Sequence, residues 1–378
     1  MRELSAGCWP LVLLMALGLI GLSGCDDAAP PRKAQPGAQT KTAGASTASR
    51  PAAAAGAPAR VEFIWPTPNQ AFAEGRDISA FIQPTASGEP RSGLFGSVRS
   101  GGRQFHEGLD MLPVSRDRKG EPLDAVGAAL AGVVRYVSLS AGNSNYGRYI
   151  VIEHPQMKPA VYTLYAHLHD VTPGLQPGRQ VAAGERIGTM GHTSSGTGIP
   201  KERAHLHFEV GLRVTDQFNS WYSRRGFGSP NPHGIWNGMN LTGVDPLELF
   251  TLQKNGELRS LEEFFDHQPP AVTLRIARAT EPDFVRRYPE LVKETGKTAL
   301  LGAQAGWEIT VNQTGLPFRW RGLGATELVG FKSGEVRIIN ADATLLAANR
   351  GRKLAGQRAG RWVVEEDLET ILQQAFGR

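Results

Sequence analysis

A few histidine and aspartate residues stand at spacings that suit metal chemistry. His106 and Asp110 lie four residues apart in the run HEGLD, where a glycine permits a tight backbone course without a helix. On a β-strand, His205 and His207 point to the same face, about 6–7 Å apart, while Leu206 points to the other. Two histidines and an aspartate with an open coordination position are a plausible ligand set for a catalytic zinc ion. Imidazole and carboxylate suit this metal where no thiolate is at hand.

Other histidines fall outside these two motifs. His167 follows a segment that is typical of a β-strand, in the run YTLYAHL, and could join the same site. Three further histidines are expected at the surface or in turns, and the last of them could line a groove because it precedes the run TSSG: His154, His169 and His192.

Two acidic residues accompany the motifs. Glu209 faces the same way as His207 in a regular strand, so it is either a hydrogen-bond partner of that imidazole or a solvent-facing residue. Glu107 is not expected to act as a base, because no helical HExxH geometry aims it.

In this order and with these neighbours, the residues resemble the lysostaphin/LytM-type zinc metalloendopeptidases, which cut peptidoglycan cross-bridges. The resemblance covers about residues 92–210, and it is carried by SGLFG at 92–96, HEGLD at 106–110, YTLYAHL at 162–168, PG at 177–178, GERIG at 184–188 and AHLHFEV at 204–210. It implies that His106, Asp110 and His207 bind one zinc ion per chain. It also implies that His167 and His205 are the catalytic pair outside the ligand set, without showing which is the general base. Asn145 matches a position near the groove of the family, with no assigned role.

The resemblance implies an enzyme that hydrolyses peptide cross-links of peptidoglycan, with stem peptides and cross-bridges as its partners. Two alternatives stay open. One is a catalytically silent LytM-like lipoprotein that binds the cell wall or activates amidases, and the other is a zinc peptidase that acts on protein substrates. The net charge of +5, from 41 basic and 36 acidic residues, suits anionic surroundings but does not indicate nucleic-acid binding.

The chain departs from the family in two polar stretches, residues 111–122 and 199–203. Loops beside such a site usually set what can enter it. They could therefore change substrate choice, or cover the groove and make activity depend on a regulatory protein partner.

The segments around the motifs predict β-structure. Three of them, 133–137, 149–153 and 160–165, are rich in β-branched and aromatic residues, and no useful helical period appears between 130 and 212. With 45 glycines and 25 prolines in 378 residues, turns are frequent. We expect residues 61–250 to form one mainly β catalytic domain of about ten short antiparallel strands, folded as a sandwich or half-open barrel.

The last part of the chain, residues 251–378, predicts a small α+β extension of unknown role. Strands are expected at 272–276, 308–311 and 336–339, and an amphipathic helix at 365–376. A wall-binding or partner-binding module and a structural extension are equally open.

The N-terminus predicts export. The apolar run 11–20 is too short to span a membrane and fits a signal peptide over 1–24. The run LSGC ending at Cys25 resembles the lipobox of bacterial lipoproteins, which implies membrane attachment through lipidated Cys25. Residues 25–60, rich in Ala, Pro and Gly, are expected to be a disordered tether. Asp26 and Asp27 resemble the inner-membrane retention signal of lipoproteins in some diderm bacteria, which implies the periplasmic face of the inner membrane rather than the outer membrane. A diderm host in turn implies a D-alanine–diaminopimelate cross-link rather than an oligoglycine bridge.

Overall fold

The computed structural model describes residues 61–293 and 304–377, which belong to one compact unit. The predicted signal peptide and tether lie outside the described residues. No helix among the described residues is long and apolar enough to cross a membrane.

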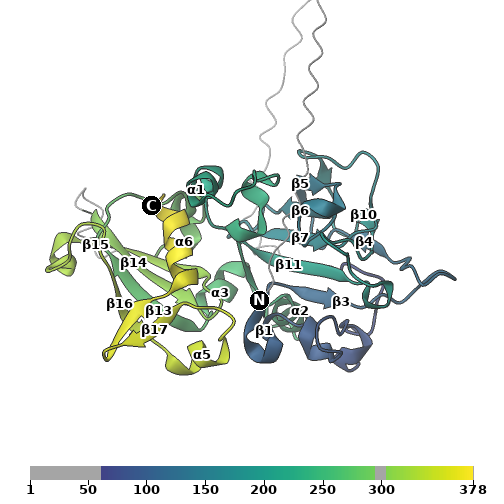
Figure 1. Ribbon diagram of the computed structural model, residues 1–378, viewed down its shortest axis with the longest axis horizontal. Helices are drawn as coiled ribbons and strands as arrows, with labels where there is room; N and C mark the ends of the chain where they lie inside the picture. The colour runs from purple at the N-terminus through teal and green to yellow at the C-terminus, as the bar shows by residue number, and fades with distance from the viewer. Residues whose placement is uncertain (1–60, 294–303, 378) are drawn as a thin grey trace, which may run out of the picture. The chain divides into compact units, whose positions relative to one another are not determined.

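A seven-stranded antiparallel sheet organises the first part of the described chain (Figure 1). Six strands follow the order β12-β11-β7-β6-β5-β9, and β3 pairs with β11 beside them. The bounds of these strands are Leu109–Met111 for β3, Gly132–Ser138 for β5, Tyr149–Glu153 for β6, Tyr162–Ala166 for β7, Gln180–Val181 for β9, Leu206–Arg213 for β11 and Leu241–Val244 for β12. The mainly β prediction is therefore confirmed, and between residues 130 and 212 the helical segments are short 3-10 turns.

Two smaller sheets complete this part. One has three antiparallel strands in the order β4-β10-β8, and the other is the β1-β2 hairpin. Their bounds are Gly96–Arg99 for β1, Gln104–His106 for β2, Ala125–Gly127 for β4, Asp170–Val171 for β8 and Arg186–Thr189 for β10. The short helices that follow are α1 (Phe218–Arg225), α2 (Pro246–Lys254) and α3 (Leu261–Asp266).

Alternation along the strands explains why both faces of the large sheet are covered. Ile150 and Ile152 of β6 belong to the main hydrophobic core, which they share with Val126 and Ile187 of the three-stranded sheet. The intervening Tyr149 and Val151 belong to a separate cluster with Trp236 on the opposite face. A period of two thus sends successive side chains into two apolar layers, and the two sheets pack as a sandwich.

The C-terminal part contains a second, four-stranded antiparallel sheet in the order β15-β14-β13-β16, together with the hairpin β17-β18. The bounds are Pro270–Ile276 for β13, Asp283–Arg287 for α4, Gln304–Asn312 for β14, Pro317–Gly324 for β15, Val336–Ala341 for β16, Ala343–Ala348 for α5, Ala355–Arg358 for β17, Arg361–Val364 for β18 and Glu366–Phe376 for α6. The three strands and the final helix expected from the sequence are all present. The α6 helix buries Leu368, Leu372 and Phe376 on one face.

Candidate metal centre

Strand pairing brings the two motifs together. Asp110 of β3 lies opposite His207 of β11 in the antiparallel register. The approach of the two chains depends on Gly108, because a Cβ atom there would lie 2.3 Å from the carbonyl oxygen of Phe208. The glycine of HEGLD thus permits close packing against the strand that carries HLH.

Three possible ligand atoms converge at the start of β11. The Nε2 atom of His106 lies 3.0 Å from the Nδ1 atom of His207. The Oδ1 atom of Asp110 is 3.0 Å from the first nitrogen and 3.1 Å from the second. All three side chains are buried. Within the described residues, this is the group of histidine, cysteine or acidic side chains that could hold a metal ion.

Hydrogen bonds on the far side of each imidazole set its tautomer. The Nδ1–H of His106 donates to the carbonyl oxygen of Leu94 at 2.7 Å. The Nε2–H of His207 donates to the Oε1 atom of Glu209 at 2.9 Å. In the neutral form of each ring, this arrangement leaves the nitrogen that faces Asp110 with a lone pair and no proton. Such outer hydrogen bonds fix the orientation of metal-binding imidazoles.

Glu209 is the centre of a buried hydrogen-bond network. Its Oε1 atom also accepts from the Tyr146 hydroxyl at 2.6 Å, and its Oε2 atom accepts from Tyr162 at 2.9 Å. Burial and the neighbouring Glu209 charge raise the pKa of both tyrosines well above the usual value, so that both remain donors. Glu209 is therefore a hydrogen-bond partner of His207 and not a solvent-facing residue of the strand.

The second oxygen of Asp110 is held from the opposite side. Its Oδ2 atom accepts from the Arg99 guanidinium and from the Thr85 hydroxyl, the latter at 2.5 Å. Burial opposes ionisation of Asp110, but its electrostatic and hydrogen-bond interactions with the surrounding histidines outweigh burial and hold its pKa well below the usual value. The carboxylate is therefore ionised and has Oδ1 directed at the two imidazoles.

The donor set fits a zinc ion. With both imidazoles neutral, three acceptor atoms face one another and repel, and a cation removes that repulsion. Three atoms bound to one tetrahedral zinc ion at about 2.0–2.1 Å lie about 3.3 Å apart, close to the spacing observed here. Without a cation, burial disfavours a charge on His207, yet hydrogen bonds to Asp110 and Glu209 outweigh it and raise the pKa of His207 to about 9. The surroundings of His207 therefore stabilise a positive charge between this ring and Asp110.

Two further histidines adjoin this centre. The ring of His167 lies 4.7 Å from that of His205 and 5.7 Å from that of His207, measured between centroids. His205 precedes β11, and its Nε2 atom lies 3.4 Å from the Oδ1 atom of Asp110. His167 directly follows β7 with a φ angle of 61°, a left-handed conformation that is uncommon for a residue other than glycine. Backbone strain of this kind clusters at functional sites.

Both of these imidazoles are arranged to accept a proton. The Nδ1–H of His167 donates to the carbonyl oxygen of Thr193 at 2.8 Å, and that of His205 donates to Arg203 at 2.7 Å. Their Nε2 atoms therefore keep lone pairs. Burial lowers the pKa of both, and for His167 the nearby His205 and His207 lower it further. Both rings are neutral at pH 7.

The centre opens into a cavity of about 350 Å³. It is lined by the histidines together with Asn145, Tyr146 and the loop that carries Ile199 and Pro200. The two polar stretches that depart from the family contact each other at this edge. Lys201 pairs with Glu121 at 3.2 Å, and Arg116 donates to the Lys201 carbonyl at 2.7 Å.

Some expectations need correction, and some residues were not foreseen. His154 is fully buried rather than at the surface, because its ring bonds to the carbonyl oxygen of Ala131 and to the Thr163 hydroxyl. His192 is half-buried and joins the two polar stretches, with Nε2 3.0 Å from Glu121. Arg99 and Thr85 had no signal in the pattern of histidines and acids, although Arg99 lies three residues after the run SGLFG.

The fold and the centre together define a class of protein: an antiparallel β-sandwich with a buried His-Asp-His group and two neutral histidines beside it. Residues 104–219 match the sequence profile of peptidase family M23, a range that includes all five of these side chains. This matched segment, about a third of the chain, is therefore similar to peptidase family M23.

Similarity to solved structures was also found, whereas no curated protein matches the chain. A zinc-containing peptidase from Vibrio cholerae is 25% identical, with 40% of this chain and 37% of that chain covered and a TM-score of 0.26. A candidate glycyl-glycine endopeptidase LytM from Ruminococcus gnavus is 23% identical over 40% and 49% of the two chains, with a TM-score of 0.27. The catalytic domain of lysostaphin from Staphylococcus simulans is 18% identical over 46% and 95%, also with a TM-score of 0.27. The chain covers less than half of the first two of these proteins.

Proposed function

We propose that the protein is a zinc-dependent endopeptidase that hydrolyses peptide cross-links of peptidoglycan. The observation that carries the proposal is the convergence of three possible ligand atoms, from His106, Asp110 and His207, beside the neutral pair His167 and His205. Similarity of the matched segment to peptidase family M23 supports the choice of peptide hydrolysis.

The ligand side chains are held before any metal arrives. Glu209 orients His207, the Leu94 carbonyl orients His106, and Arg99 holds the second oxygen of Asp110. When bound, zinc supplies a Lewis acid that polarises the scissile carbonyl and lowers the pKa of water. The rigid strand β11 and its neighbours position these groups better than a loop would.

His167 and His205 supply the proton transfers in this proposal. A neutral imidazole with a free Nε2 atom can take the proton of the attacking water and return it to the leaving amine. In its protonated form, the same or the second ring can donate a hydrogen bond to the oxyanion of the tetrahedral intermediate. The two rings have equivalent hydrogen bonds at Nδ1, so the choice of general base is left open between them.

The location of the protein is inferred from its N-terminal sequence, not from the metal centre. We propose export with a signal peptide over 1–24 and membrane attachment through lipidated Cys25, on the evidence of the run LSGC. Radiolabelled palmitate that enters the wild-type chain but not a Cys25→Ala chain would support lipidation, and equal labelling of both would refute it.

The test of activity is digestion of purified sacculi with mass analysis of the released fragments, combined with metal analysis of the protein. The wild-type chain should hold one zinc ion and release cleaved peptides. His106→Ala should lose both zinc and activity. His205→Ala and His167→Ala should each keep zinc and lose about 10²–10⁴-fold in rate.

His169→Ala is the matched control. His169 is exposed, two residues from His167, and should leave zinc content and rate unchanged. A wild-type chain that binds zinc but leaves sacculi intact would favour the silent wall-binding alternative. Cleavage of unfolded proteins in preference to sacculi would favour the protein-peptidase alternative.

A further inference from the structure

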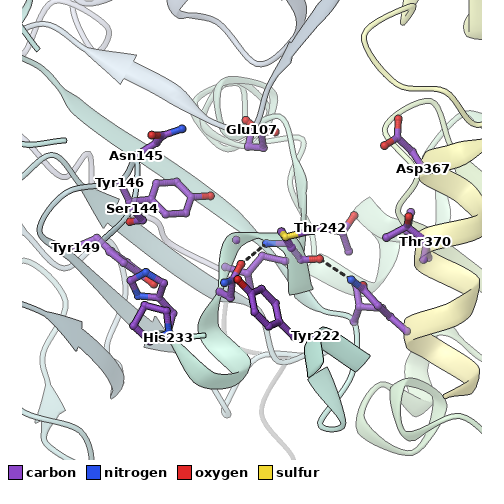
Figure 2. A pocket seen from close by; sticks show the side chains of 18 of the residues that line it. Glu107, Ser144, Asn145, Tyr146, Tyr149, Tyr222, His233, Thr242, Asp367 and Thr370 are labelled. Atoms are coloured by element: carbon purple, nitrogen blue, oxygen red, sulfur yellow. Dashed lines mark hydrogen bonds between the residues drawn. The ribbon is translucent and has the colours of Figure 1, made fainter. Parts of the chain in front are cut away.

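A second, larger cavity lies between the metallopeptidase part and the C-terminal part of the chain (Figure 2). Its volume is about 590 Å³. Tyr146, Tyr149 and His233 line one side, and Asp367 and Thr370 of α6 line the other, with Glu107 at the margin.

This cavity adjoins the space in front of the metal centre. Glu107, Asn145 and Tyr146 line both cavities. Tyr146 also donates to Glu209, the carboxylate that orients His207. A substrate chain that crosses the metal centre therefore has a path along these three residues to α6.

The C-terminal wall is fixed by hydrogen bonds rather than by loose contact. The Nε2 atom of Gln374 donates to the Met239 carbonyl at 2.9 Å. The guanidinium of Arg352 lies 3.3 Å from the Glu107 carboxylate and stacks over the Phe105 ring at 4.3 Å.

Polar atoms without a partner gather around this cavity. Gln374 is 1% exposed, yet its Oε1 atom has no hydrogen-bond partner among the described residues. The same holds for Ser144 Oγ and Arg352 Nε, which belong to other residues of the lining. Buried polar atoms in native proteins are nearly always hydrogen-bonded to protein, water or a ligand, so these three atoms are available to a polar ligand.

The charges of the lining indicate the sign of that ligand. Glu107 and Arg352 pair with each other and cancel. Burial lowers the pKa of His233, which is neutral at pH 7. Asp367 accepts a hydrogen bond from the backbone nitrogen of Lys353, whereas the ammonium group of Lys353 pairs with Glu366. The lining thus has one carboxylate in excess.

We propose that this cavity is a substrate subsite, built jointly with the C-terminal part, that receives a peptide arm with a free ammonium group. Asp367 is the specificity-determining residue, because it meets the ammonium group, while Thr370 and Gln374 offer polar groups to neighbouring amides. The proposal rests on the proposed function, since it places this arm on the same substrate whose scissile bond lies at the metal centre.

Two matched peptides test the proposal. Both are cross-linked stem peptides that contain diaminopimelate, one with its free amine and one acetylated at that nitrogen. Dissociation constants are measured by calorimetry on the zinc-loaded full chain with His205→Ala to block turnover, and kcat/KM on the chain with His205 intact. The free-amine peptide should bind about fivefold more tightly, as expected for a partly exposed ion pair.

Asp367→Asn should abolish this preference, because it removes the charge and keeps an oxygen for the backbone of Lys353. Glu366→Gln is the control, an exposed acid on the same helix outside the cavity lining, and it should keep the preference. Thr370→Val tests the location without a change of charge, and it should weaken both peptides by about threefold.

Equal binding of the two peptides by the wild-type subsite would overturn the proposed ligand. A preference that survives Asp367→Asn, or affinities unmoved by Thr370→Val, would overturn the proposed place. If peptides bind with the predicted preference but are never cleaved, the proposed endopeptidase activity fails and the subsite stands. If the peptides are cleaved without preference, the endopeptidase activity stands and the proposed subsite fails.

Discussion

The substitution Glu209→Gln separates the electrostatic role of this buried residue from its structural role. The carboxylate accepts from His207, Tyr146 and Tyr162, and its side chain is 2% exposed. A glutamine oxygen can still accept from His207 and Tyr146. The Tyr162 hydroxyl can turn to accept from the new amide nitrogen. The variant therefore keeps its hydrogen-bond count and loses one negative charge.

We expect Glu209→Gln to weaken zinc binding. A carboxylate behind an imidazole raises the basicity of the ligand nitrogen, and removal of such a partner costs about 10–100-fold in metal affinity. This corresponds to about 1.4–2.7 kcal/mol. Zinc affinity is measured by competition with a chromophoric chelator, and folding of the metal-free chain by circular dichroism during thermal unfolding.

Glu107→Gln is the control for this experiment. Glu107 follows the proposed ligand His106 directly but pairs with Arg352, and its side chain is 45% exposed. Its replacement should leave zinc affinity within about twofold, as for other exposed charges. If Glu209→Gln and Glu107→Gln bound zinc as tightly as the wild-type chain, the assigned tautomer of His207 and the role of Glu209 would both be wrong.

Three further substitutions test the surroundings. Burial lowers the pKa of His154 to about 4 in the folded chain, against 6.5 in the unfolded chain. Its neutral form therefore contributes about 3 kcal/mol of stability above pH 6.5, and this contribution should be lost as the pH falls to 4. Urea titrations of His154→Gln should lack this part of the pH profile. Gly108→Ala should push β3 away from Phe208, so the zinc content should fall and the free energy of unfolding should decrease by about 2 kcal/mol. Arg99→Met should leave the buried Asp110 charge without its guanidinium and destabilise the metal-free chain by about 2–3 kcal/mol in urea. Unchanged midpoints in any of the three would contradict the corresponding contact.

Local patterns predicted much of the sheet and the shared strand face of His205 and His207. Alternating β-branched and aromatic residues fix a strand through a period of two, and the same period places His205, His207 and Glu209 along one side of the chain. The amphipathic repeat of α6 is equally local, and its predicted bounds differ from the structure by one residue. The identity of the partner strand is not local, so only the family resemblance joined Asp110 to His207.

Residues that reach the site from other segments of the sequence were not predicted, for a physical reason. Arg99 and Thr85 reach Asp110 from separate segments, and neither residue type signals metal chemistry alone. His154 was expected at the surface because a lone histidine after a strand usually faces water. The structure buries it because Thr163 and a backbone carbonyl satisfy both ring nitrogens. Burial of a polar residue depends on such partners, which one sequence does not disclose.

The architecture separates the parts that must be rigid from those that can vary. Strand β11 is bonded to β3, β7 and β12, so the backbone beneath His207 is fixed on both sides. The walls of the larger cavity come partly from loops and from α6, and it shares Glu107, Asn145 and Tyr146 with the cavity at the metal centre. Substitutions on α6 can therefore change which peptide binds without disturbing the metal site. This separation makes the two proposals independently testable, because zinc content reports on the sheet and peptide preference reports on the walls.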